Sequence, residues 1–205
     1  MIKLIATDID GTLVKDGTLI IDPEYMTVIS KLIDKGIIFT VCSGRQFSSE
    51  QKLFAPIKDK LMYITDGGTV VRTPDRILKT YPMSNELWKD MCRMVRDELP
   101  ACDYFAASPD LCYAEDGASP IFHRLRDSYG FEMREIDDLT KLENDDIIKF
   151  TVYHPDSCEE LCSPHFIPAW KDKAHVTSAG KEWVDCNRSG ISKWTAVSFL
   201  MDKYN

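Results

Sequence analysis

The first third of the chain alternates short apolar runs with stretches of helical periodicity. Residues 2–7, 37–42 and 61–65 are almost entirely apolar, a pattern typical of strands buried on both faces. Between the first two runs, Asp22-Pro23 is a helix start signal and Gly36 is a stop signal. A further helix is predicted to end near residue 57. Strand, helix, strand, helix and strand in this order predict an α/β fold built on a parallel sheet.

Two hairpins are predicted beside this sheet. Residues 13–21 form the first around Lys15-Asp16-Gly17, and residues 69–79 form the second around Thr73-Pro74-Asp75. Asp16-Gly17 and Asp75 are interpreted as turn residues. The second hairpin is expected to lead out of the sheet.

Residues 82–185 have a different pattern. It predicts an amphipathic helix from about Leu87, further helices at 119–130 and 156–163, a strand at 147–153, and hairpins at 104–113 and 175–186. Helices laid on antiparallel strands predict an α+β domain. The last predicted helix, 190–203, places four apolar side chains on one face: Trp194, Val197, Leu200 and Met201.

Charge divides the chain in the same way. The 205 residues carry a net charge of −8, but residues 82–185 contain 11 Lys and Arg against 22 Asp and Glu, and the remainder contains 14 against 11. The middle segment therefore lacks the basic face that nucleic acids require. Seven cysteines without a disulfide-framework spacing predict reduced thiols. No signal peptide and no run of ~20 apolar residues is found, which predicts a cytoplasmic protein without membrane contact.

Polar motifs follow each of the three predicted parallel strands. They are Asp8-Ile9-Asp10-Gly11-Thr12, Ser43-Gly44-Arg45 and Asp66-Gly67-Gly68. Because ligands bind beyond the carboxyl ends of parallel strands, the three motifs predict one ligand site. In an extended chain Asp8 and Asp10 face the same side, and such carboxylates repel unless a cation or a shared proton lies between them. The simpler alternative is a solvated turn in which Asp is only a turn former.

A fourth motif, Gly190-Ile191-Ser192-Lys193, places a lysine near the start of the last predicted helix, where the helix dipole disfavours a cation. With these motifs, the whole chain resembles the haloacid-dehalogenase-like phosphatases, in particular the Cof-like branch. The resemblance implies a Rossmann-like α/β core at residues 1–81 and 186–205, with an α+β cap domain inserted at residues 82–185.

The resemblance also implies roles for individual residues. It implies a Mg²⁺-dependent hydrolase of phosphate monoesters that acts on a small phosphorylated metabolite such as a sugar phosphate. Asp8 would be the nucleophile that forms an aspartyl-phosphate, and Asp10 would be the general acid and base. Ser43 and Lys193 would bind the phosphoryl oxygens, and Asp8 and Asp10 would bind Mg²⁺. The implied substrate-binding residues are Gly11, Thr12, Gly44, Arg45, Asp66 and Gly67.

The chain departs from the family pattern after Lys193. The family's fourth motif is an acidic pair that supplies further metal ligands, but only twelve residues follow Lys193 and Asp202 is the one acid among them. We therefore expect weakened metal binding and activity, and self-association through the exposed edge of the first strand, whose neighbours are missing. A fragment of a longer protein would have the same pattern. The alternative function is a non-catalytic remnant that binds phosphorylated ligands or a protein partner.

Two further groups of residues have competing interpretations. His154, Cys158, Cys162 and His165 are spaced for one helix face and for Zn²⁺. The thiols are more simply explained as small core side chains, with Pro155 and Pro164 breaking the helix at both ends. Cys42 is a candidate nucleophile, but its alternation with Ser43 along the strand predicts that it points into the core.

Overall fold

The computed structural model describes residues 2–15, 18–143 and 146–204 and divides the chain into two compact units. The first unit contains Met1–Thr80, Arg124–Phe131 and Ser192–Asn205, and the second contains Tyr81–His123 and Glu132–Ile191. The chain thus leaves the first unit twice and returns to it twice. A division based on the sequence alone has one insertion, because nothing in the sequence marks Arg124–Phe131 as part of the first unit.

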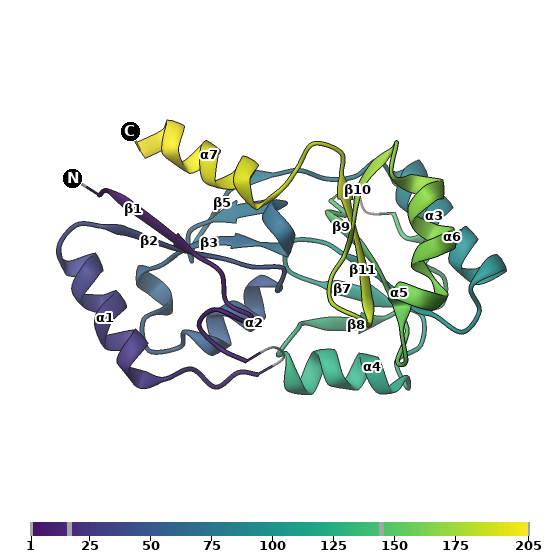
Figure 1. The fold of residues 1–205 in the computed structure, drawn as a ribbon, viewed down its shortest axis with the longest axis horizontal. Coiled ribbons are helices and arrows are strands. Elements are labelled where there is room, and N and C mark those ends of the chain that lie inside the picture. The colour runs from purple at the N-terminus through teal and green to yellow at the C-terminus, as the bar shows by residue number, and fades with distance from the viewer. Residues whose placement is uncertain (1, 16–17, 144–145, 205) are drawn as a thin grey trace. The chain divides into compact units, whose positions relative to one another are not determined.

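A five-stranded sheet, with the strand order β1-β2-β3-β4-β5, forms the centre of the first unit (Figure 1). The strands β1 (Leu4–Thr7), β2 (Ile38–Cys42) and β3 (Met62–Thr65) are parallel, which confirms the predicted parallel sheet. The strand β4 (Val70–Arg72) pairs antiparallel with β3, and β5 (Ile77–Thr80) pairs antiparallel with β4. The second predicted hairpin therefore exists, but it extends the sheet instead of leaving it.

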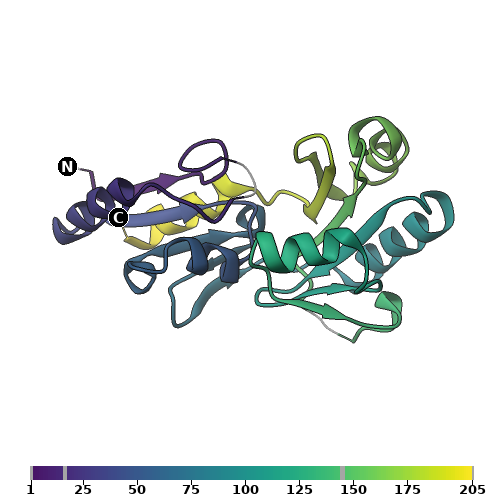
Figure 2. The ribbon, with the colours of Figure 1, turned by 90° about the horizontal axis from the view of Figure 1, so that it is seen from below.

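Helices cover both faces of this sheet (Figure 1, Figure 2). The helices α1 (Pro23–Asp34) and α2 (Phe47–Leu53) pack on one face, where Ile29, Phe39 and Phe47 belong to one apolar cluster. The helix α7 (Lys193–Tyr204) packs on the other through Ala196 and Leu200. The helix α1 begins as predicted, because the Asp22 carboxylate accepts the Glu24 N–H at 2.9 Å. The unit also contains two short 3₁₀ helices, Lys58–Lys60 and Asp66–Gly68, and a π-helix, Arg124–Ser128.

Some predictions for the first unit are wrong. Residues 13–15 and 18–21 form no strand, and the expected turn at Asp16-Gly17 lies outside the described residues. The helix α2 ends at Leu53, short of residue 57. The strand β1 is only partly buried, because β2 is its sole paired strand within the described ranges. On α7, Val197 and Leu200 of the expected apolar face pack in the core, whereas Trp194 and Met201 are 69% and 51% exposed.

The second unit contains a six-stranded sheet with the order β10-β11-β9-β6-β7-β8. All neighbouring strands are antiparallel except β7 and β8. The helices α3 and α6 lie side by side (Figure 1), where the Trp170 Nε1–H donates to Met94 Sδ. The strands are β6 (Asp103–Ala107), β7 (Cys112–Ala114), β8 (Met133–Glu135), β9 (Lys149–Tyr153), β10 (Ala174–Ser178) and β11 (Trp183–Arg188). The helices are α3 (Asn85–Glu98), α4 (Pro120–His123), α5 (Cys158–Leu161), α6 (Ser163–Trp170) and a 3₁₀ turn (Leu139–Lys141).

The α+β pattern of this unit is confirmed, but the strand β8, the helix α6 and the 3₁₀ turn Leu139–Lys141 were not predicted from the sequence. The strand β8 is short and only its first residue is partly buried, so it lacks an apolar signature. The helix α6 has Pro164 in its first turn, where proline is tolerated, and it continues past Pro168. Pro164 therefore begins a helix instead of ending one.

The cysteines of the second unit do not form a zinc site. Cys102 and Cys162 are paired as a disulfide, with Cα atoms 7.6 Å apart, so the expectation of reduced thiols fails for this pair. Cys158 is free and buried. The His154 ring Nδ1 accepts the N–H groups of Asp156 and Ser157. The part of the chain that the structure describes contains no group of three or more metal-ligating side chains.

Candidate active site

Asp8 follows β1 directly and has a partly exposed carboxylate. Its Oδ2 lies 2.9 Å from the Lys193 Nζ, and its Oδ1 accepts the Ile9 N–H at 2.8 Å. The Asp8 side chain is 44% exposed, so a ligand can reach it. Ile9 is fully buried, and its carbonyl accepts the N–H groups of Thr12, Leu13 and Val14. The buried Ile9 therefore anchors the turn that presents Asp8.

Lys193 is the first residue of α7, and its backbone is closely held. Ser192 and Thr195 exchange backbone and hydroxyl hydrogen bonds, which cap the helix. A Cβ added at Gly68, where φ is +105°, would lie 2.3 Å from the Ser192 carbonyl oxygen. The start of α7 therefore rests directly on the Asp66–Gly68 turn. The dipole of α7 disfavours a cation here, and the Asp8 carboxylate offsets that penalty.

The Asp10 carboxylate is bound by Arg45. The Arg45 Nε and Nη2 donate to the two Asp10 carboxylate oxygens at 2.8 and 2.7 Å, and Nη2 also donates to the Thr18 carbonyl. Arg45 is only 3% exposed, whereas the Asp10 side chain is 26% exposed. A bidentate guanidinium fixes the plane of a carboxylate as well as its position. Each of the two aspartates thus has its own cation, Lys193 or Arg45.

Ser43 directly follows β2, in a loop that is hydrogen-bonded to the turn after β3. Ser43 is 1% exposed, and its Oγ accepts the Arg45 N–H at 3.1 Å. The Gly67 N–H donates to the Ser43 carbonyl, and the Asp66 N–H donates to the Arg45 carbonyl, both at 2.9 Å. Asp66 has φ 51°, a left-handed conformation that non-glycine residues seldom adopt. Its carboxylate accepts the Thr65 hydroxyl and is fully buried.

The structure thus links the predicted residues in two groups. Asp8 contacts Lys193, while Asp10, Ser43, Asp66 and Gly67 are each hydrogen-bonded to Arg45 or to its loop. Gly11 and Thr12 lie exposed in the turn after Asp10, and Gly44 is half-buried. Arg45 and Asp66 are both buried.

The sequence did not indicate Glu50, a buried acid close to these residues. Glu50 lies on α2 with no exposed surface, and neither carboxylate oxygen has a hydrogen-bond partner within the described ranges. Burial raises the pKa of Glu50 well above its usual value, Asp66 raises it further, and Arg45 opposes both effects. A polar residue in a short helix is normally read as solvent-facing, so no signal in the sequence marked it.

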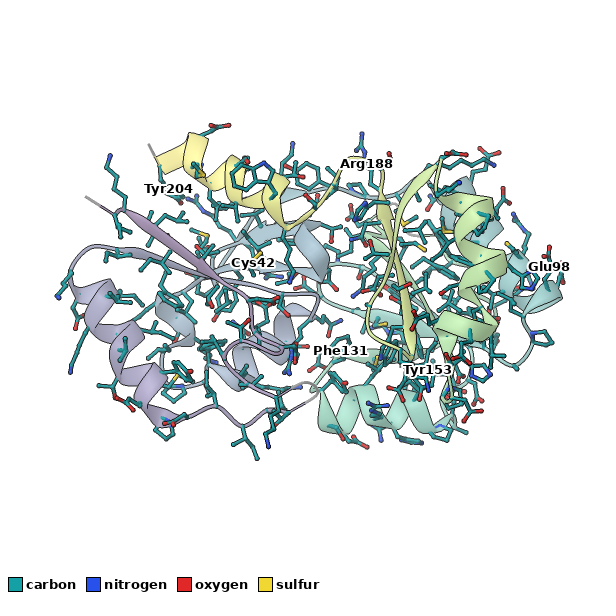
Figure 3. The ribbon with its side chains drawn as sticks, in the orientation of Figure 1. Cys42, Glu98, Phe131, Tyr153, Arg188 and Tyr204 are labelled. Atoms are coloured by element: carbon teal, nitrogen blue, oxygen red, sulfur yellow. A yellow bond between two sulfur atoms is a disulfide. The ribbon has the colours of Figure 1, made fainter. Side chains whose placement is uncertain are left out.

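Cys42 lies in the core of the first unit (Figure 3). It packs with Ile64, Ala196 and Leu200, which confirms that it points away from Ser43. Burial raises the pKa of its thiol to about 12, although Lys193 lowers it in part. A thiol that remains protonated at neutral pH is a poor nucleophile.

Comparisons with known proteins identify the family and the fold. The sequence model of the haloacid dehalogenase-like hydrolase family matches residues 5–205. A crystal structure from Eubacterium rectale is 78% identical, with a TM-score of 0.88, over all of this chain and 77% of its own. The sugar phosphatase BT4131, of the haloacid dehalogenase subclass IIB, has the same fold at 16% identity, with a TM-score of 0.78 over 98% of this chain and 76% of its own.

Two curated relatives are named 5-amino-6-(5-phospho-D-ribitylamino)uracil phosphatases. YbjI of Escherichia coli is 26% identical over 147 residues, which are 70% of this chain and 52% of that protein. YwtE of Bacillus subtilis is 32% identical over 87 residues, which are 42% of this chain and 30% of that protein. The chain therefore spans only 52% and 30% of the length of these two relatives. No helix in the described ranges combines the length and apolar character needed to cross a membrane. From the family match over residues 5–205 and the geometry around Asp8, the chain belongs to the haloacid dehalogenase-like hydrolases.

Proposed function

We propose that the chain hydrolyses phosphate monoesters through an aspartyl-phosphate on Asp8. The observation that carries this proposal is the partly exposed Asp8 carboxylate at the end of β1, 2.9 Å from Lys193 Nζ. A nucleophile for phosphoryl transfer must be reachable by the substrate, and positive charge must lie close to the phosphoryl oxygens. Asp8 and Lys193 meet both requirements.

The other residues take the remaining roles. The Asp8 carboxylate attacks phosphorus, the bond to the leaving oxygen breaks, and protonated Asp10 gives its proton to that oxygen. In the second step ionised Asp10 takes a proton from water, whose oxygen attacks the phosphorus and releases Asp8 and inorganic phosphate. The Ser43 hydroxyl donates a hydrogen bond to a phosphoryl oxygen. Arg45 donates two N–H groups to the Asp10 carboxylate, which stabilises the ionised form that the second step uses.

The donor set around Asp8 fits a Mg²⁺ site that the substrate completes. Mg²⁺ prefers oxygen ligands, keeps several waters, and is often held by one or two carboxylates together with substrate phosphate. Asp8 has a partly exposed carboxylate for this purpose, and Asp10 adds oxygen atoms two residues away. When bound, the ion would screen the repulsion between the Asp8 carboxylate and the phosphate dianion. With so few protein ligands, we expect its affinity in the absence of substrate to be weak.

A small phosphorylated metabolite is the proposed substrate class. Support comes from the names of the curated relatives, both phosphatases of a phosphorylated ribityl compound, and from the sugar phosphatase that shares the fold. The 22 acidic residues within 82–185 make long polyanions poor candidates because they would be repelled.

The decisive experiment measures hydrolysis of p-nitrophenyl phosphate and of a panel of metabolite monoesters, with Mg²⁺ and with EDTA. We expect Mg²⁺-dependent phosphate release that Asp8→Asn abolishes, whereas Asp34→Asn, an exposed change at the end of α1, leaves it unchanged. Wild-type protein that binds phosphorylated ligands but releases no phosphate would instead support the non-catalytic alternative.

A further inference from the structure

The residues Arg124–Phe131 pack with the first unit, although the chain on both sides of them belongs to the second. One backbone carbonyl anchors this segment. The Gly130 oxygen accepts the Ser48 hydroxyl at 3.0 Å and the Lys52 Nζ at 2.8 Å, both from α2. Gly130 has φ +74°, and a Cβ added there would approach the Lys52 side chain to 2.8 Å. The segment therefore has a defined position on α2.

The anchor places an aromatic ring beside Arg45. The Tyr129 ring centroid lies 5.7 Å from the Arg45 Cζ, within the range of a cation–π contact. Phe131, labelled in Figure 3, packs edge-on against the Tyr129 ring at 6.2 Å between centroids. Arg124 lies at the same 5.7 Å distance from this ring. The ring is thus held by its own segment while it contacts the guanidinium.

Arg45 needs such a contact because its hydrogen bonds are incomplete. Two of its nitrogens bind Asp10, but Nη1 is buried and has no hydrogen-bond acceptor within the described ranges. A buried cation without its full set of partners is costly, and the face of an aromatic ring compensates in part. The guanidinium is therefore held from one side by Asp10 and from another by Tyr129.

We propose that Tyr129 is a positioning residue, whose ring keeps the Arg45 guanidinium in the orientation that binds Asp10. The consequence for catalysis rests on the proposed function, in which Asp10 is the acid and base. The Tyr129–Arg45–Asp10 arrangement itself does not depend on that function. No polar motif pointed to Tyr129, which lies 84 positions beyond Arg45 in the sequence.

The test combines a spectroscopic and a kinetic measurement on the full chain. The Arg45 Nε–H signal is followed by ¹H–¹⁵N NMR, assigned by its loss in Arg45→Lys and referenced to its position in Asp10→Asn. We expect Tyr129→Leu to move it toward the Asp10→Asn position, whereas Tyr129→Phe, which keeps the ring, leaves it in place. The matched control Tyr25→Leu, at an exposed tyrosine of α1, should also leave it in place.

The kinetic arm measures aryl-phosphate hydrolysis. Tyr129→Leu should lower kcat about 3- to 30-fold, the range of a partly desolvated cation–π contact, and change KM less than twofold. Tyr129→Phe should have the kcat of the wild type. In the Arg45→Met variant, adding Tyr129→Leu should cause no further loss of kcat. Lys52→Met, which removes one anchor of Gly130, should move the NMR signal in the same direction and serves if Tyr129→Leu does not fold.

The two arms separate the two proposals. An Arg45 Nε–H signal that stays in place in folded Tyr129→Leu overturns the positioning role, whatever the activity. If Tyr129→Phe loses as much kcat as Tyr129→Leu, the positioning role is overturned as well, because Tyr129→Phe retains the aromatic ring. A wild-type protein without hydrolytic activity overturns the proposed function, and the NMR arm still decides the inference.

Discussion

Lys193 contributes a charge that the local backbone does not favour, because it stands at the positive end of the α7 dipole. Its ammonium group lies 2.9 Å from Asp8 and is 41% exposed, so a phosphoryl group bound at Asp8 would also lie within its reach. Removal of one preorganised cation at a reacting oxygen typically lowers rates about 100-fold.

We therefore expect Lys193→Met to reduce kcat/KM for aryl phosphates by about 100-fold. The control is Lys203→Met on the same helix, where the exposed lysine stacks on Tyr204 and not on an acid. Steady-state kinetics of the two variants check the prediction. Equal activity of the Lys193→Met and Lys203→Met variants would show that Lys193 does not take part in catalysis.

Glu50 makes stability depend on pH in a direction opposite to that of most surface acids. Its pKa is well above 4.5 in the folded protein because of burial, whereas the unfolded chain releases the proton near that value. The folded state therefore holds the proton more tightly. This contribution to stability is complete below about pH 4.5 and is lost as pH rises toward the folded pKa, by up to about 1.4 kcal/mol per pH unit.

Glu50→Gln removes this titration, so we expect its stability relative to wild type to increase from pH 5 to pH 7. Urea unfolding at the two pH values measures the difference. Glu98→Gln, at the end of α3, should show no such trend over this range. A constant difference between Glu50→Gln and wild type would mean that Glu50 is ionised in the folded protein.

Residues next to strand ends were predictable, and residues brought in by packing were not. Asp8, Ser43 and Lys193 follow from motifs at the ends of apolar runs and before a helix, which depend on local sequence only. Glu50 and Tyr129 depend on how α2 and Arg124–Phe131 pack against Arg45, a contact that no local pattern encodes.

Among the elements, α1 shows most directly how a local signal stabilises structure. The Asp22 carboxylate accepts the Glu24 N–H and Pro23 occupies the first turn. We expect Asp22→Ala to lower the free energy of unfolding by about 1 kcal/mol, and Asp22→Asn, which retains an acceptor, to lower it much less. Urea denaturation compares the wild type with the two variants. A similar loss of unfolding free energy in both variants would mean that the charge of Asp22, and not its hydrogen bond to the Glu24 N–H, stabilises the helix.

The parallel strands and most helices were predictable because their apolar runs and caps are strong and local. The predictions failed where tertiary context decides. A hairpin was expected at residues 13–21, but the turn from Gly11 to Val14 is tied to the Ile9 carbonyl and no strand forms in the described part. On α7 only part of the predicted apolar face is packed: Leu200 and Val197 join the core with Ala196, whereas Trp194 remains exposed.

On the scale of the whole molecule, the free edge of β1 is the feature with the clearest consequence for association. Among the described strands β1 pairs only with β2, and Ile2 beside it is 69% exposed. Unpaired backbone groups at a sheet edge favour pairing with another chain.

We expect sedimentation velocity to show concentration-dependent association, reduced by Ala6→Lys, which places a charge on an exposed position of β1. The control Val28→Lys changes an exposed position on α1, away from this edge. A single monomeric species at all concentrations of the wild-type protein would exclude pairing through β1.

The double return of the chain to the first unit limits how its parts can be exchanged between relatives. Replacing residues 81–191 by a short linker would also delete Arg124–Phe131, and with it the carbonyl that binds Ser48 and Lys52. A chimera that takes the second unit from another protein would need two grafts, at 81–123 and 132–191, with the native segment kept between them. Each unit is compact in space, but neither consists of one continuous stretch of the sequence, so neither can be exchanged as a single segment.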